Sequence, residues 1–143
     1  MPSKTDTPLL LDTHCLVWFV EGIEGMFSAR SRESIRAATR GTGLCVSVMS
    51  FWEVALLVTK GRLRLSLPID DWIALTLERL APLVLDVTLP IALESTRLPN
   101  LAHADPIDRM LLATARVSDL ILLTKDRVML DYGCKGYVRT VDA

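Results

Sequence analysis

Cysteine and histidine are scarce in this sequence. The cysteines, Cys15, Cys45 and Cys134, lie far apart without a Cys-x-x-Cys spacing, and the histidines are His14 and His103. Structural zinc sites need several closely spaced Cys or His ligands, so this pattern argues against zinc. It also argues against a nucleophilic triad, because no serine or cysteine motif accompanies the histidines. We therefore expect a reduced, cytoplasmic protein whose cysteines are small, buried apolar residues.

The chain also lacks a strong net charge and a long apolar segment. Its 16 basic and 17 acidic residues leave a formal charge of −1, so there is no global basic field to attract nucleic acid. Residues 1–7 are polar, and the apolar run from Leu9 to Val20 is broken by Asp12 and His14, so we expect neither a signal peptide nor a membrane span. Any nucleic-acid partner must therefore be held by a local basic patch or a bound metal ion.

Alternating apolar runs and amphipathic segments predict a single α/β domain. Half of the 143 residues are apolar, which is enough for one core, and no repeats, linkers or low-complexity tracts are present. Residues 1–7 are expected to be a flexible N-terminal tail and residues 8–143 a single domain. Repeated strand and helix units favour a central parallel sheet flanked by helices on both faces. Strands are predicted at 8–13, 44–48, 83–87, 120–124 and 137–140, and helices at 16–19, 28–40, 50–61, 68–81, 90–97 and 105–117, with a helical turn at 128–130.

Two predicted helix starts carry acidic residues. Ser50 followed three residues later by Glu53 matches a capping box, which places Glu53 in the first turn of its helix. Asp105 followed by Pro106 is a strong start signal, since Asp is a good N-cap and Pro is tolerated at the first helical position. Asp108 then falls at the third position. The apolar stripe predicted for this helix is Ile107, Met110, Leu111, Thr114 and Val117.

Four acidic residues, Asp12, Glu53, Asp108 and Asp126, stand where predicted strands end or predicted helices begin. An open α/β sheet has its active site at the carboxyl ends of the strands, so these side chains are expected to converge. Two carboxylates about 4 Å apart repel by roughly 4 kcal/mol at an effective dielectric near 20, and a divalent cation relieves that repulsion. The cluster therefore predicts a metal site, which could orient a phosphodiester and lower the pKa of a bound water.

Each acid also has a purely structural interpretation. Asp12 follows three leucines and Asp126 follows a buried strand, and for both a functional role is favoured over a hydrogen bond at a strand end. Glu53 could be only the reciprocal member of its capping box. Asp108 gains roughly 0.3 to 1 kcal/mol from the helix dipole in any case. For Asp105, helix capping is favoured over metal ligation.

The residues around these acids resemble the PIN-domain family, and in particular its VapC-type ribonuclease toxins of bacterial and archaeal toxin-antitoxin pairs. The resemblance runs from about Leu9 to Val141. Four motifs occur in family order, which is far more specific than any one of them. One departure is Ile107, where many relatives have an aromatic residue, and this exchange concerns the core. The motifs are Leu-Leu-Asp12-Thr13-His14, Ser50-Phe-Trp52-Glu53-Val, His103-Ala-Asp105-Pro106-Ile-Asp108-Arg109 and Leu-Leu-Thr124-Lys125-Asp126.

The resemblance implies a PIN fold and cleavage of RNA that depends on Mg²⁺ or Mn²⁺. It implies that Asp12 and Asp108 are direct metal ligands, that Glu53 binds the metal directly or through water, and that Asp126 is the fourth acid. It also implies a homodimer and a cognate antitoxin as partners. Residues beside the acids that could hold a carboxylate or a water in place are Thr13, Thr124 and Asp105.

An acidic pocket repels phosphate, so an RNA substrate needs cations at the rim. Arg109 and Lys125 adjoin proposed site residues and are the candidates for contacting phosphate. For a second basic group, on one predicted helix, a solvated surface is favoured. That group is Arg30, Arg32, Arg36 and Arg40, and a third group near a helix end is Lys60, Arg62 and Arg64.

The aromatic residues are assigned to packing. His14 is expected to pack or to hydrogen-bond near the site. The three tryptophans fall on apolar helix faces, so packing in the core or at a dimer contact is favoured over stacking on bases. These tryptophans are Trp18, Trp52 and Trp72.

Two other functions fit parts of the same pattern. A phosphoryl-transfer enzyme or receiver-like switch on a doubly wound sheet predicts a phosphorylated aspartate. The phosphatase type usually has a second acid two residues after the first, and this chain has His14 at that position. A non-catalytic binding module would keep the fold and dock a partner protein without metal-dependent activity.

Overall fold

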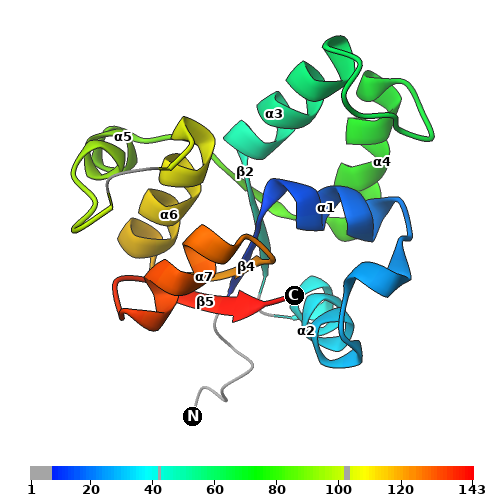
Figure 1. Ribbon diagram of the computed structural model, residues 1–143. Coiled ribbons are helices and arrows are strands. Elements are labelled where there is room, and N and C mark those ends of the chain that lie inside the picture. Colours follow the sequence, from blue (N-terminus) through cyan, green and yellow to red (C-terminus); the bar gives the residue numbers. More distant parts are fainter. Residues whose placement is uncertain (1–7, 42, 102–103) are drawn as a thin grey trace.

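The computed structural model describes residues 8–41, 43–101 and 104–143 (Figure 1). The expected tail at residues 1–7 and the histidine His103 lie outside these residues. Five strands form one sheet in the order β3-β2-β1-β4-β5, and every neighbouring pair is parallel. The predicted parallel α/β architecture is confirmed. The strands are β1 (Leu9–Leu11), β2 (Leu44–Ser47), β3 (Leu83–Leu85), β4 (Ile121–Thr124) and β5 (Arg139–Asp142).

Helices cover both faces of the sheet, as predicted. Leu11 and Leu123 belong to a core with α1 to α4, whereas Leu10 and Leu122 belong to a core with α5 to α7. Strands buried on both faces explain the continuous apolar runs in the sequence. Within the described part of the chain, no helix is long and apolar enough to cross a membrane. The helices are α1 (Thr13–Val20), the 3-10 turn η2 (Glu24–Met26), α2 (Ala29–Arg40), α3 (Val48–Thr59), α4 (Ile69–Leu80), α5 (Leu89–Thr96), α6 (Pro106–Ser118) and α7 (Arg127–Cys134).

The register of the central strands brings their carboxyl ends to one edge. Leu10 is aligned with Cys45 of β2, and Leu11 is aligned with Leu123 of β4. The residues that follow these strands, including Asp12 after β1, therefore emerge side by side. This edge is where the predicted acids meet.

Helix α3 begins earlier than predicted. Its N-cap is Ser47, whose hydroxyl accepts a hydrogen bond from the backbone N–H of Met49, and β2 passes into the helix without a loop. Ser50 is therefore a fully buried residue of the first turn and not the cap. Glu53 lies six residues after Ser47, too far to close a capping box. The structural interpretation of Glu53 is wrong.

Three further expectations differ from the structure. The predicted turn at 128–130 is the eight-residue helix α7, because Asp126 caps it by accepting a hydrogen bond from the Met129 N–H at 3.0 Å. Val117 is 46% exposed, and Leu112 is buried on α6 instead. Cys134 is exposed near the end of α7, whereas the other two thiols are buried as expected.

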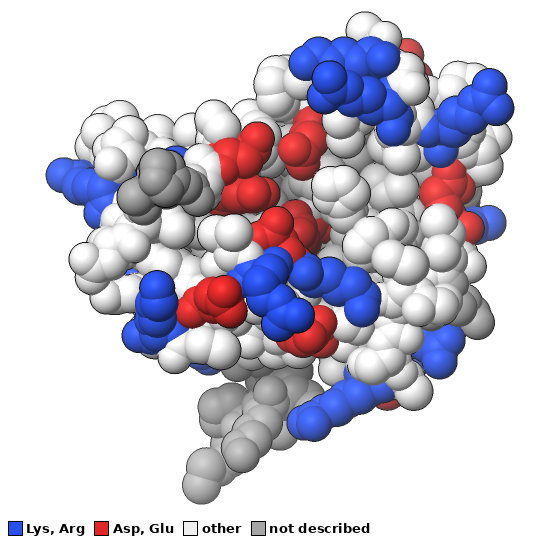
Figure 2. All heavy atoms as spheres, in the orientation of Figure 1, with Lys and Arg blue, Asp and Glu red and all other residues white. Residues whose placement is uncertain are grey.

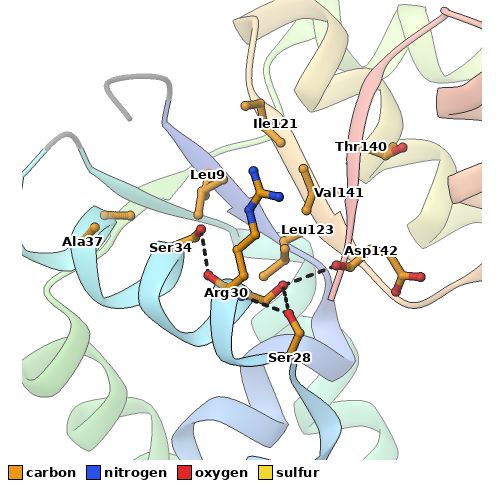
Figure 3. Close-up of a pocket in the computed structure, with 12 residues that line it drawn as sticks. Leu9, Ser28, Arg30, Ser34, Ala37, Ile121, Leu123, Thr140, Val141 and Asp142 are labelled. Carbon is orange, nitrogen blue, oxygen red and sulfur yellow. Dashed lines mark hydrogen bonds between the residues drawn. The ribbon is translucent and has the colours of Figure 1, made fainter. Parts of the chain in front are cut away.

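The sheet is incompletely covered near its β5 edge. A hollow of about 650 Å³ lies between α2 and strands β1, β4 and β5 (Figure 3). Its floor is apolar, and the Arg30 side chain extends over Leu9, Ile121 and Val141. A long basic side chain can cover apolar surface in this way while its charge stays in water. The four predicted acids are not among the lining residues of this hollow, so the chemistry lies elsewhere.

Close packing of α7 on β5 gives a prediction for Gly133. A Cβ at this position would lie 1.9 Å from the Thr140 Oγ1 and 2.8 Å from its Cβ. Alanine normally favours a helix over glycine by about 1 kcal/mol, but here overpacking should dominate and destabilise the chain by roughly 1 to 3 kcal/mol. Chemical denaturation of Gly133→Ala measures this loss, and adding Thr140→Gly should relieve it.

The matched control is Gly25→Ala, since a Cβ there meets no described atom within 4 Å. This variant should stay within roughly 0.5 kcal/mol of the wild type. Equal stabilities of the two alanine variants would contradict the close packing of α7 on β5.

Candidate active site

A hollow of about 440 Å³ at the carboxyl edge of the sheet brings the predicted acids together. Figure 2 shows acidic side chains gathered at the centre of this face, with basic side chains beside them. All four acids from the sequence pattern line the hollow, together with Asp105. The lining residues are Asp12, His14, Trp18, Glu53, Asp105, Asp108, Lys125 and Asp126.

Asp12 is the most deeply buried of these acids, with 6% of its surface exposed. Its backbone N–H donates to the Leu123 carbonyl, which continues the pairing of β1 with β4. Its Oδ1 accepts a hydrogen bond from the Thr13 N–H at 2.7 Å, and its Oδ2 accepts one from the Thr124 hydroxyl at 2.7 Å. Both carboxylate oxygens are thus fixed in direction, and each keeps a lone pair for a further partner.

Thr124 connects two of the acids. Its buried hydroxyl donates to Asp12 and also accepts a hydrogen bond from the Asp126 N–H at 2.9 Å. Asp126 in turn uses Oδ1 to cap α7, so its carboxylate is held by the helix that follows β4. Asp126, for which the sequence pattern predicted no capping role, therefore caps a helix.

Glu53 comes from the second turn of α3 and is half-buried. The helix is tied to α1 beside it, because the Thr13 hydroxyl donates to the Ser50 hydroxyl at 3.1 Å. Ser47 caps α3, so the position of Glu53 is not explained by a capping hydrogen bond. Its carboxylate nevertheless lines the hollow.

Asp108 lies in the first turn of α6, as predicted. The predicted cap is also confirmed, because the Asp105 Oδ1 accepts a hydrogen bond from the Ile107 N–H at 2.8 Å. Asp105 lines the hollow as well, so its charge adds to those of the other acids.

The electrostatics show that these carboxylates act on one another. Burial, followed by the charges of Asp12, Asp126, Asp105 and Glu53, raises the pKa of Asp108 from 3.8 to about 7. Burial also raises the pKa of Asp12, against the lowering effect of its hydrogen bonds to Thr124 and Thr13. The hollow thus concentrates negative charge at a cost to the folded chain.

The chemistry of the donor set fits a hard divalent cation. Among the described residues, no three His, Cys, Asp or Glu side chains are close enough to form a ready-made metal cage. Mg²⁺ does not need such a cage, because it keeps several waters and binds through one or two carboxylates. Asp12, Asp108 and Glu53 could hold the ion, directly or through water, and its charge would offset their repulsion.

The two basic candidates differ in their surroundings. Lys125 is exposed and lines the hollow. Arg109 donates to the carbonyls of Ser95 at 3.1 Å and Leu101 at 2.8 Å, which fastens α5 and the following loop to α6. This geometry gives no support to the expected phosphate contact of Arg109, because its guanidinium donates hydrogen bonds to main-chain carbonyls instead.

Trp18 is the lining residue that the sequence pattern did not assign to the site. It lies four residues after His14 on α1, and the two ring centroids are 6.0 Å apart. The other tryptophans are placed differently, because Trp72 is fully buried and Trp52 is 52% exposed outside the lining of the hollow. The spacing of Trp18 from Asp12 and His14 is a signal that could have indicated its position.

A protein-family model described as the PIN domain matches residues 9–133, which is most of the chain. The chain belongs to the PIN-domain family. It is 30% identical over 121 residues to Ribonuclease VapC22 of Mycobacterium tuberculosis, an overlap that covers 85% of this chain and 88% of the relative. This PIN domain is therefore of the VapC type, which confirms the resemblance seen in its motifs.

Solved structures from several organisms have the same fold. DNA-bound VapBC from Salmonella typhimurium matches with a TM-score of 0.69 and 20% identity, covering 95% of this chain and 98% of that chain. FitAcB from Neisseria gonorrhoeae matches with a TM-score of 0.62 and 20% identity, covering 92% and 95%. At this level of identity the likeness concerns the fold alone.

The raised pKa of Asp108 predicts how the stability of the metal-free PIN domain depends on pH. The folded chain binds this proton more tightly than the unfolded chain, so stability should fall as pH rises from about 4 to about 7. With a chelator present, we expect a Tm roughly 5 to 10 °C higher at pH 5 than at pH 8 by calorimetry.

The Asp108→Asn variant separates this effect from other titrations. The Tm of this variant should decrease much less between pH 5 and pH 8 than the Tm of the wild type. Adding Mg²⁺ at pH 8 should also raise the Tm of the variant less than that of the wild type. An equal pH dependence in wild type and variant would refute the assignment of the effect to Asp108.

The position of Thr124 predicts a loss of metal affinity in Thr124→Val. The variant keeps the shape of the side chain but leaves the Asp12 carboxylate and the Asp126 N–H without their shared partner. We expect Mn²⁺ binding, measured by isothermal calorimetry, to weaken by roughly 10- to 100-fold.

Two variants serve as controls for Thr124→Val. Thr124→Ser retains the hydroxyl and should retain most of the affinity. Thr114→Val also removes a buried threonine hydroxyl, but one bonded to the Met110 carbonyl within α6, and should leave Mn²⁺ binding unchanged. A Thr124→Val variant with normal affinity would show that the hydroxyl does not orient Asp12.

Proposed function

We propose that this PIN domain is a divalent-metal-dependent endoribonuclease and the toxin of a VapBC-type pair. The observation that carries the proposal is the meeting of Asp12, Glu53, Asp108 and Asp126 in one hollow at the carboxyl edge of the sheet. The VapC relative supports RNA as the substrate, since that protein is named a ribonuclease.

The side chains divide the work of holding the ion and the substrate. Asp12 and Asp108 bind Mg²⁺ or Mn²⁺ directly, and Glu53 binds it directly or through water. The bound ion supplies polarisation of the phosphoryl oxygen and a lowered pKa for an attacking water. Asp126 completes the negative cluster and orients water.

Neighbouring residues set the geometry of this arrangement. Thr124 and Thr13 fix the two oxygens of Asp12, so that its lone pairs are directed before the substrate arrives. Lys125 attracts the phosphate at the rim, where the acids would otherwise repel it. Water is the nucleophile, so the reaction needs no serine or cysteine nucleophile.

The proposed partners are RNA, a cognate antitoxin and a second copy of the chain, and the proposed location is the cytoplasm. One solved structure with the same fold is a toxin-antitoxin complex from Klebsiella pneumoniae, and others contain VapBC and FitAcB, which supports the expectation of such a partner here. The phosphatase type of the phosphoryl-transfer alternative is disfavoured because His14 stands two residues after Asp12, where that type usually has a second acid. The binding-module alternative predicts neither metal-dependent heat nor metal-dependent cleavage.

Cleavage of RNA by the purified chain tests the proposal. We expect cleavage with Mg²⁺ or Mn²⁺, loss with EDTA and recovery when the metal is restored. Asp12→Asn and Asp108→Asn should each lower the rate by about 100-fold or more, because each removes a metal-holding charge. The measurement is the single-turnover rate on a labelled RNA mixture.

The matched control is Asp131→Asn, which makes the same chemical change at an exposed position of α7 outside the lining of the hollow. It should cleave RNA at the wild-type rate. Full activity of a folded Asp12→Asn variant would overturn the role of Asp12, and absence of any metal-dependent cleavage by the wild type would overturn the proposed function.

A further inference from the structure

Two aromatic side chains share the hollow with the acids. Helix α1 starts directly after Asp12, and the four-residue spacing of His14 and Trp18 puts both rings on one face of the helix. Both line the hollow, with ring centroids 6.0 Å apart and ring planes at 45°. One edge of an otherwise charged hollow is therefore an aromatic surface.

The aromatic pair is held in place but not sealed in the core. The Trp18 ring packs edge-on against Phe27, with centroids 6.3 Å apart and planes at 74°. Trp18 is half-buried and His14 is exposed. Trp72 shows what a purely structural tryptophan looks like in this fold, since it is fully buried. The contrast indicates that His14 and Trp18 keep ring surface available to a ligand.

The charge balance of the hollow shows why such a surface is needed. Among the described residues that line it, Lys125 carries the only permanent positive charge, against five carboxylates. Phosphate contacts alone would give weak attraction here, even with a metal ion offsetting part of the charge. Stacking on a base adds affinity without adding charge, and removing one stacking side chain weakens binding of single-stranded nucleic acid by roughly 5- to 150-fold.

We propose that His14 and Trp18 form a stacking platform for an unpaired base of the RNA, next to the phosphate held at the acids. This inference rests on the proposed ribonuclease function and adds the residues that position the substrate beside the cut. Because His14 is two residues from Asp12 in the chain, the stacked base belongs to a nucleotide flanking the scissile phosphate. An RNA target must therefore present that base outside a duplex.

Binding with Ca²⁺ in place of Mg²⁺ or Mn²⁺ tests the platform apart from cleavage, because the phosphate still has a cation at the acids. The dissociation constant of an end-labelled oligoribonucleotide containing the mapped cut site is measured by fluorescence anisotropy. Trp18→Ala and His14→Ala should each raise Kd by roughly 5- to 100-fold, and Trp18→Phe should restore most of the loss, because a phenyl ring still stacks. Trp52→Ala is the control at an exposed tryptophan outside the lining of the hollow, and it should leave Kd unchanged.

Salt dependence separates stacking from phosphate contacts. The slope of log Kd against log salt should be unchanged in Trp18→Ala but smaller in Lys125→Met, since only the latter removes a charge that displaces counterions. A smaller slope in Trp18→Ala would overturn the stacking assignment.

An abasic substrate keeps the proposal testable if Trp18→Ala is poorly folded. Each nucleotide flanking the cut is replaced in turn by one without a base. One of these substrates should bind the wild type roughly 5- to 100-fold more weakly than the intact RNA does, a result that needs no variant. A folded Trp18→Ala should lose nothing further on that substrate. Equal losses for Trp18→Ala on intact and abasic RNA would overturn the platform in favour of a structural role.

The remaining outcomes distinguish failure of the stacking platform from failure of the proposed ribonuclease function. If the wild type cleaves RNA with Mg²⁺ but Trp18→Ala and His14→Ala bind and cleave as the wild type does, the platform is wrong and the ribonuclease function stands. Loss of a protein partner by these variants, with RNA binding unchanged, would likewise overturn the platform and identify a protein-docking surface. If the wild type cleaves no RNA under any metal, the proposed function fails first.

Discussion

The buried carboxylate of Asp12 is the constraint around which the rest of the structure is arranged. Burying a charge at the end of a strand that is apolar on both faces costs free energy. Thr13 and Thr124 offset this cost, because each donates a hydrogen bond to one oxygen of the Asp12 carboxylate. Those two residues begin α1 and end β4, so the same hydrogen bonds that stabilise the charge also fix the two elements beside it. Asp12 lines the hollow in which the other acids gather.

Function here opposes stability in a way that can be traced to particular side chains. Burial and the charges of four neighbouring carboxylates raise the pKa of Asp108, which destabilises the folded chain. The leucine-rich strands and two separate cores stabilise it. A protein selected for stability alone would replace several of these acids with neutral residues. Their joint presence supports the proposal that the hollow binds a cation. Asp105 and Asp126 also cap helices, so one carboxylate can both stabilise a helix and add charge to the hollow.

The sequence predicts the architecture and the convergence of the four acids, but one structural alternative that it allows for them is wrong. The apolar runs located the parallel strands, and the Asp105-Pro106 signal located the start of α6. The spacing of Ser50 and Glu53 allows a capping box as the alternative to a site role for Glu53, yet Ser47 starts the helix. Local spacing cannot tell which of two serines does so. Trp18 could have been placed from its spacing on α1, whereas Arg109 could not, because its carbonyl partners come from a different helix and its loop.

The hydrogen bond between Thr124 and Asp12 joins positions 112 residues apart in the chain. Closing so long a loop is among the slower events of folding, because its entropy must be lost before the contacts it brings can compensate. The centre therefore does not exist in any partly folded form that lacks the pairing of β1 with β4. The proposed hydrolytic centre therefore appears only with the complete sheet, and a chain that is still folding carries the acids but not their arrangement.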